Sequence, residues 1–254
     1  MQSINRILIV GVLLTAIAFL PVFAQEGEIK QAETAYAAEQ YEQAIELYES
    51  ILKHYGASAE LYYNLGNAYF KTGKLAQAIL NYERAILLKP GDNDVRFNLE
   101  LVRQQTVDKI EPLQQFFLKK WALSIENMMS VDYWAMIGIA GFVLFIGCLA
   151  LYFFSKWMYL KKVGFYLGIV LICAVIFANI FAANQKKHLE NRNGAIIFTP
   201  SVTIKSSPDN SGTDLFLLHE GTKVFILTSV GEWNEIVLED GNQGWINKKD
   251  IVII

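Results

Sequence analysis

The sequence predicts a multidomain membrane protein that contains an α-helical repeat solenoid, two transmembrane helices and a small all-β barrel, in that order along the chain. Three observations support this fold class. The stretch from Leu61 to Pro90 places aromatic and small residues at the spacing of a repeated helical hairpin. Two later stretches, 133–154 and 163–183, are apolar and free of charge over membrane length. From residue 194 onward, short alternating runs are separated by turn residues, as in small β domains.

Composition narrows the possible functions before any motif is considered. The chain has 254 residues, of which 53% are hydrophobic, and a formal net charge of −3, so it has no basic stripe for nucleic acid. The first apolar segment, 7–20, follows Arg6 and ends at Pro21-Val22-Phe23-Ala24. This pattern predicts a signal peptide over 1–24, cleaved after Ala24. An uncleaved anchor would place the rest of the chain on the same side of the membrane.

The repeated hairpin has the features of a tetratricopeptide repeat (TPR). Eight residues occupy the diagnostic positions of that 34-residue pattern, namely Tyr62, Leu65, Gly66, Tyr69, Ala78, Tyr82, Ala85 and Pro90. Gly66 and Ala78 are small where two helices are expected to cross, and Pro90 is expected to end the second helix. The resemblance implies a protein that binds other polypeptides.

Weaker copies flank this repeat. Ala32, Ala44 and Tyr48 match it 34 residues earlier, and Asp92 to Gln105 has the spacing of one further helix. We therefore expect about two and a half repeats over 25–106. Because about three repeats are needed to bury a continuous core, this array is expected to lean on another chain, on its own copy or on the membrane.

The first helix of each repeat lines the concave face of a TPR array, where partners usually bind. On that basis the candidate groove residues are Tyr63, Asn67, Phe70 and Lys71. Asn67 and Lys71 form a hypothetical clamp for a peptide carboxylate. The same two residue types also occur in unspecialised repeats, so they indicate a groove without identifying its ligand.

Residues 107–132 are expected to connect the repeats to the membrane. After the break at Glu111-Pro112, apolar residues recur at helical spacing; they are Leu113, Phe117, Trp121, Ile125 and Met128. Two interpretations remain open for this amphipathic segment. It is either an interfacial helix on the bilayer or a connector packed against the repeats.

The two apolar stretches predict transmembrane helices at 133–154 and 163–183, joined by a turn at 155–162 with three lysines and no acid. The basic turn favours a cytoplasmic hairpin tip, but Lys186, Lys187 and Arg192 follow the second span at similar density, so charge does not decide the topology. The predicted signal peptide decides it, because once the repeats are exported two spans return the C-terminal region to the periplasmic side. Cys148 and Cys173 lie inside the predicted spans and are expected to be structural. Asn179 is the one strongly polar residue well inside a span, which argues against a transporter or channel.

A linker is expected over 184–193, followed by the β domain over 194–254. Its six predicted strands are 195–199, 202–205, 215–218, 223–228, 233–238 and 244–247. The domain resembles bacterial SH3-like (SH3b) modules through Glu232-Trp233 and Gly244-Trp245-Ile246. Trp233 and Trp245 either form an aromatic binding shelf for a peptide or glycan, or fill the barrel core. His219 is expected to make a turn hydrogen bond.

The sequence contains no motif for nucleotide, metal or nucleophilic chemistry, so we expect a non-enzyme without cofactor or metal. The three histidines fall in different segments and have no paired carboxylates around them. Catalytic, cofactor and metal residues are therefore predicted to be none.

The order of the segments resembles the BatE-type TPR members of the Bacteroides aerotolerance (Bat) operon proteins, notably through Asp108-Lys109-Ile110-Glu111-Pro112 before the Phe-Phe and Trp stretch. That resemblance implies an inner-membrane scaffold that acts in aerotolerance or envelope stress. Its implied partners are membrane proteins with von Willebrand A domains and, indirectly, a MoxR-type ATPase. The alternative is a cell-wall-binding adaptor or membrane sensor that recognises peptidoglycan or peptide.

Overall fold

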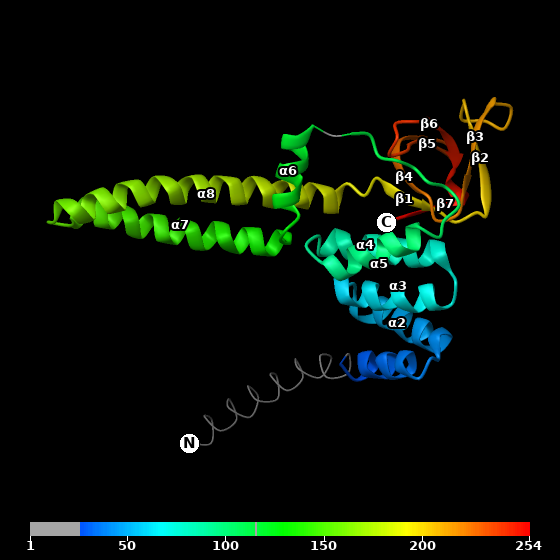
Figure 1. Cartoon of the computed structure of the whole chain (residues 1–254), viewed down its shortest axis with the longest axis horizontal. Helices are drawn as coiled ribbons and strands as arrows, with labels where there is room; N and C mark the ends of the chain where they lie inside the picture. Colours follow the sequence, from blue (N-terminus) through cyan, green and yellow to red (C-terminus); the bar gives the residue numbers. More distant parts are fainter. Residues whose placement is uncertain (1–25, 115) are drawn as a thin grey trace, which may run out of the picture.

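The computed structural model describes residues 26–114 and 116–254, so the predicted signal peptide lies outside the described residues. Figure 1 shows a long helical hairpin that extends to one side of a body made of stacked helices and a β-sheet. The repeats, the sheet and the connector between them all lie at the same end of this hairpin.

The repeat region consists of helical residues 26–37 followed by α2 (Tyr41–Tyr55), α3 (Ala59–Lys71), α4 (Leu75–Leu88) and α5 (Asn93–Arg103). Local signals explain where these helices begin. The Ser58 side chain accepts a hydrogen bond from the Leu61 N–H at 3.1 Å, and Asp92 caps α5 in the same way. Gly73 has φ +75° in the turn before α4, a conformation that favours glycine.

The helix crossing inside the best repeat explains its pattern. A Cβ atom added at Gly66 would lie 2.8 Å from the ring of Tyr82, which is fully buried. Ala78 is also fully buried. Small residues at these two places therefore let α3 and α4 approach closely enough to enclose a tyrosine.

The connector crosses from the repeats to the sheet before it turns back toward the membrane-length helices (Figure 1). Ile110 packs against the core of the sheet, and the Leu113 N–H donates to the Glu239 carbonyl at 3.0 Å. A short helix, α6 (Phe117–Glu126), follows and stands roughly across the axis of the hairpin (Figure 1).

The hairpin consists of α7 (Val131–Phe154) and α8 (Met158–Glu190). Both helices are long and apolar enough to cross a membrane, with mean hydropathies of 2.4 and 2.5. The turn is shorter than expected, because only residues 155–157 separate the helices. The predicted linker is also largely helical up to Glu190, because residues 184–190 contain no glycine or proline to end the helix.

Small residues occupy the contact between α7 and α8. A Cβ atom at Gly164 would lie 2.8 Å from the Cys148 carbonyl oxygen, and one at Gly141 would lie 2.9 Å from Val175. Asn179 donates to the Val175 carbonyl within its own helix at 2.8 Å, so its amide is satisfied locally. Close backbone approach therefore determines how the hairpin packs.

The C-terminal region is one antiparallel sheet of β1 (Gly194–Ile197), β2 (Ser201–Lys205), β3 (Asp214–His219), β4 (Lys223–Val230), β5 (Trp233–Val237), β6 (Gln243–Asn247) and β7 (Ile251–Ile253). All six predicted strands are present, whereas β7 was not predicted. The strand order is β3-β2-β6-β5-β4-β1-β7, so β3 and β7 are edges and the expected closure into a barrel is not observed. The β7 edge is occupied instead by the repeats, since Arg84 donates to the Ile253 carbonyl at 2.9 Å.

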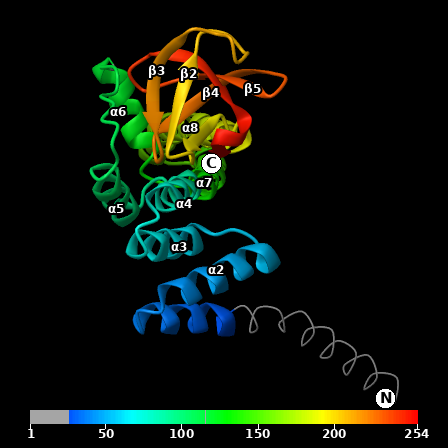
Figure 2. The ribbon, with the colours of Figure 1, turned by 90° about the vertical axis from the view of Figure 1, so that its right-hand side faces the viewer.

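The repeats pack against this sheet. Ile196 of β1 and the C-terminal Ile254 belong to the same buried cluster as Ile79 and Leu80 of α4. Figure 2 shows the sheet on the α4 side of the stack, with α3 and α2 progressively farther from it. The short array therefore packs against the β domain of its own chain. This partner was not among the three expected ones, which were another chain, a second copy and the membrane.

Candidate interaction sites

The predicted groove residues lie on one face of α3. Tyr63, Asn67, Phe70 and Lys71 follow one another at intervals of four, three and one residues, which places them along a single side of the helix. Lys71 is exposed and the other three are half-buried. One exposed cation beside aromatic side chains is suited to holding a polypeptide partner.

Hydrogen bonds to the neighbouring helices hold two of these residues in place. The Tyr82 hydroxyl donates to Asn67 Oδ1 at 2.7 Å, and Asn98 Nδ2 of α5 donates to the same oxygen at 3.0 Å. Asn98 Nδ2 also lies 3.0 Å from the Tyr63 hydroxyl. The Asn67 carbonyl is thus used inside the array, and only its amide nitrogen and Lys71 remain for the hypothetical carboxylate clamp.

The last helix of the array adds two groove residues that we did not predict. Phe97 is 69% exposed and Leu101 is 38% exposed on α5. They stand 34 positions after Tyr63 and Asn67, and so occupy the equivalent positions of the next repeat. Applying the repeat length to the groove residues would have identified them. We call Tyr63, Asn67, Phe70, Lys71, Phe97 and Leu101 the α3–α5 groove.

The structure places Trp233 and Trp245 on the outer face of the sheet. Both are half-buried and absent from the buried core cluster. Each alternates along its strand with buried residues such as Ile236 and Ile246, which point to the opposite face. The core-filling interpretation is therefore wrong for both tryptophans.

The register places both tryptophans on this outer face in adjacent strands. Trp245 pairs with Glu235, and Trp233 pairs with Asn247, so the two indole side chains are diagonal neighbours across β5 and β6. Leu217 is 51% exposed on edge strand β3, on the other side of β2. Whether this surface binds a ligand stays a prediction.

Asp108 joins the connector to the sheet. Its carboxylate accepts hydrogen bonds from the His219 N–H and the Thr222 hydroxyl, both at 2.7 Å, and lies 2.9 Å from His219 Nδ1. Burial acts to raise the pKa of this carboxyl, but the hydrogen bonds from Thr222 and His219 outweigh it and hold the pKa below its ordinary value. The His219 side chain thus binds a distant segment, while its carbonyl accepts a turn hydrogen bond from the Thr222 N–H at 3.4 Å, as expected.

Glu83 joins the repeats to both of their neighbours. This buried carboxylate pairs with Arg103 of α5 at 2.5 Å and with Lys223 of β4 at 2.7 Å. Both cations are only partly exposed, so the pairs are better shielded from solvent than typical surface ion pairs. These contacts escaped prediction because Glu83 and Lys223 are 140 residues apart.

The polar clusters at these sites make contacts within the chain. Within the described ranges, no group of three or more histidine, cysteine or acidic residues could hold a metal ion. The hydrogen-bonded and charged clusters described above join one part of the chain to another.

Comparison with known proteins supports the repeat assignment. Residues 29–94 match the tetratricopeptide repeat family, a segment that spans α2, α3 and α4 and reaches the start of α5. The predicted TPR region is thereby confirmed over these residues. No curated protein matches the chain.

Proposed function

We propose that this protein is a non-enzymatic scaffold of the bacterial inner membrane, which presents its TPR groove and its SH3-like sheet to protein partners in the periplasm. The observation that carries the proposal is the α3–α5 groove. It is an exposed face of a TPR array, with Phe97 and Lys71 accessible, and TPR arrays bind polypeptides.

Exposed apolar side chains support the membrane location. Only 11% of the apolar window in each hairpin helix is buried, which would be costly in water over two such helices. On α6, Phe117 and Trp121 are 67% and 66% exposed, while Glu126 alone is buried. This favours the interfacial interpretation of the connector over packing against the repeats.

The proposed sidedness rests first on the predicted signal peptide, which would export the repeats; the charge at the hairpin tip agrees with it but is matched by Lys186, Lys187 and Arg192 at the other end. Lys156, Lys161 and Lys162 cluster at the hairpin tip, where the positive-inside rule favours the cytoplasm. The repeats and sheet adjoin the other end of the hairpin (Figure 1), which corresponds to the periplasm.

The resemblance to the Bat proteins extends the proposal to an aerotolerance or envelope-stress assembly. The partners would then be membrane proteins with von Willebrand A domains and, indirectly, a MoxR-type ATPase. Because the repeats and the sheet are packed together, a partner in the groove would meet a rigid unit instead of two modules on a flexible linker.

A second candidate function is a cell-wall-binding adaptor or sensor. The outward Trp233 and Trp245 favour it, because indole rings partly exposed on one face of a sheet suit a glycan or an extended peptide. The turn of only residues 155–157 argues against signalling across the membrane, because it leaves little surface for an effector on the far side.

The topology is tested with single cysteines in a chain whose native cysteines are replaced by alanine. Asn210→Cys lies on the exposed loop between β2 and β3, and Lys156→Cys lies at the hairpin tip. An impermeant thiol reagent should label the first from the periplasm and the second only after the inner membrane is broken. The reverse pattern would refute the proposed sidedness.

Partner binding is tested by crosslinking intact membranes and identifying what copurifies with the chain in mild detergent. Lys71→Glu and Phe97→Ala should each reduce recovery of the main protein partner, whereas Lys53→Glu, on exposed α2 surface, should not. Unchanged recovery with both groove variants would exclude the groove. Recovery of wall fragments that depends on Trp233 and Trp245 would instead favour the adaptor.

A further inference from the structure

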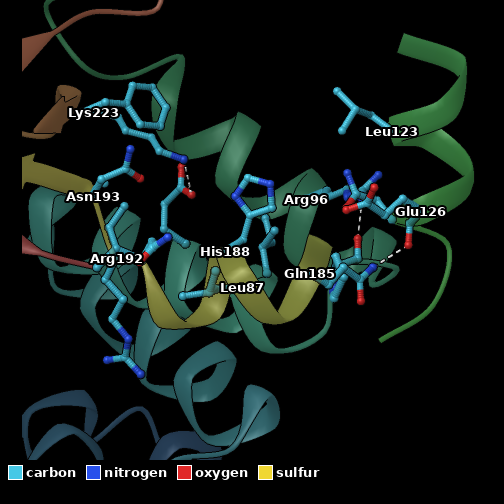
Figure 3. Close-up of a pocket in the computed structure, with 17 residues that line it drawn as sticks. Leu87, Arg96, Leu123, Glu126, Gln185, His188, Arg192, Asn193 and Lys223 are labelled. Carbon is cyan, nitrogen blue, oxygen red and sulfur yellow. Dashed lines mark hydrogen bonds and ion pairs between the residues drawn. The ribbon is translucent and has the colours of Figure 1, made fainter. Parts of the chain in front are cut away.

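A cavity lies where four parts of the chain meet. It has a volume of about 340 Å³ and is bounded by α4, the end of α6, the last turns of α8 and the sheet near Phe225 and Ile254. This volume falls at the lower end of small-molecule sites. Figure 3 shows the labelled residues around it, which we call the junction cavity.

Two buried oxygen-bearing residues border the junction cavity. Glu126 is 5% exposed, and its carboxylate receives one long hydrogen bond from Asn184 at 3.4 Å. Among the residues that the structure describes, Glu126 forms no ion pair. A buried carboxylate with so little compensation favours a cationic ligand.

Gln185 adds an unused acceptor beside it. Its amide nitrogen donates to the Glu126 and Met129 carbonyls, which fastens the α6–α7 turn to α8. Its Oε1 atom is buried and has no hydrogen-bond partner in the described part of the chain. Together Glu126 and Gln185 would suit a group that is both cationic and rich in N–H donors, such as a primary ammonium.

Cationic side chains border the same cavity. Arg96 donates one hydrogen bond to the Pro90 carbonyl and has further N–H groups. The exposed His188 lies between Arg96 and Lys223 in Figure 3. Guanidinium and imidazole groups are common ligands of phosphate. The cavity thus combines a site for an ammonium with donors for a phosphate.

Its place along α8 indicates where such a ligand would come from. The apolar part of α8 ends at Ala183, immediately before Asn184 and Gln185. Trp134 and Phe181 pack together close by, with ring centroids 5.0 Å apart, and aromatic residues favour the headgroup zone. If α8 crosses the bilayer, the junction cavity lies at the depth of lipid headgroups.

We propose that the junction cavity binds the headgroup of an aminophospholipid. Its ammonium group contacts Glu126 and Gln185 Oε1, and its phosphate contacts Arg96 and His188. This inference rests on the proposed membrane location. A bound headgroup would fill the junction between hairpin, repeats and sheet, and so couple the rigid unit to the membrane surface.

The test uses the full chain in nanodiscs that contain phosphatidylethanolamine, phosphatidylcholine and phosphatidylglycerol in equal amounts, followed by native mass spectrometry. We expect one retained phosphatidylethanolamine, favoured at least tenfold over the other two lipids. Phosphatidylcholine is the key comparison with phosphatidylethanolamine, because its quaternary ammonium has no N–H to donate. Equal retention of the three lipids, or retention of none, would overturn the proposal.

Variants identify the site. Glu126→Gln should abolish the preference, whereas Glu190→Gln, which changes an exposed acid at the end of α8, should leave it intact. If both variants keep the preference for phosphatidylethanolamine, the assignment to this cavity is overturned. In a second experiment, soluble phosphoethanolamine is added to the protein in detergent, and its effect on the unfolding temperature is compared with that of phosphatidylethanolamine. If both raise the unfolding temperature equally, the ligand is not specifically a lipid.

Alkaline extraction of native membranes distinguishes failure of the lipid site from failure of the proposed membrane location. A chain released by alkali would refute the membrane location itself. A chain that resists extraction but retains no aminophospholipid would refute only the lipid site.

Discussion

The repeats and the sheet form one body, and the α7–α8 hairpin extends from it. These two regions are packed in opposite ways. The body encloses large side chains such as Tyr48 and Tyr82 and joins its parts with buried charges such as Glu83. The hairpin brings two helices together through glycines such as Gly164 and leaves most of its apolar surface exposed. Close packing in the hairpin therefore comes from backbone contact rather than from a side-chain core.

This difference agrees with the proposed location, in which the body lies in water and the hairpin lies in lipid. In water, burial of apolar area drives association, and buried charges must be paired. Within lipid that driving force is absent, so small residues that permit close approach become decisive. Four predictions follow from this contrast, and each changes one region while a matched site serves as control.

The largest effect is expected from removing the charge that joins the repeats to the sheet. Glu83→Ala leaves Arg103 and Lys223 without their common partner and should lower the free energy of unfolding by about 3 kcal/mol. The measurement is denaturant unfolding in mild detergent, followed by circular dichroism. Glu100→Ala, at an exposed position on α5, should change stability by less than about 0.5 kcal/mol. Equal effects of the two variants would mean that Glu83 contributes no more than a surface charge.

A smaller loss should follow from crowding the repeat core. Gly66→Ala places a methyl group against the Tyr82 ring and should cost about 2 kcal/mol, despite the better helix propensity of alanine. Gly27→Ala, which meets nothing within 4 Å, should be neutral or slightly stabilising in the same unfolding experiment. A neutral Gly66→Ala would show that the ring can move aside.

The corresponding change in the hairpin is read through the native cysteines. Gly164→Val should separate α7 from α8 and raise the labelling rate of buried Cys148 by a membrane-permeable maleimide about tenfold, equivalent to about 1.4 kcal/mol. Exposed Cys173 serves as the internal reference. Gly147→Val, at a site with open space, should leave both rates unchanged. An unaltered Cys148 rate in the Gly164 variant would contradict packing through glycine.

The smallest effect concerns the pH dependence of the Asp108 contact. Its pKa is below the ordinary value of 3.8 in the folded chain, so its stabilising contribution is present above that value and is lost as the pH falls through the folded pKa. Asp108→Asn should cost about 1 kcal/mol at neutral pH, and this cost should shrink progressively as the pH falls below 3.8. Unfolding midpoints between pH 7 and pH 3 measure this, and Asp240→Asn in an exposed turn is the control. A difference that does not shrink on acidification would exclude the carboxylate as its source.

Much of the molecule could be read from local patterns. The spacing around Gly66, the charge-free lengths of α7 and α8, and the alternation of β5 and β6 each predicted an element that the structure contains. Such features depend on residues close together in the chain. The terminal strand β7 was missed because three residues, Ile251 to Ile253, are too few to show a period.

The candidate sites were predictable only in part. Tyr63 and Lys71 followed from the repeat pattern, and the same register would have identified Phe97. The placement of Trp233 and Trp245 was left open, because alternation shows that residues share a face but not which face is buried.

Local patterns predict the order of repeats, apolar helices and strands, because helix and strand periods, turn residues and uninterrupted apolar lengths depend on residues close together in the chain. The folded arrangement was needed to show that the repeats pack on the sheet, that Asp108 contacts His219, and that Glu83 contacts Lys223. Those contacts join residues more than a hundred positions apart. Their partners are selected by the shape and charge of folded surfaces, which no local pattern encodes.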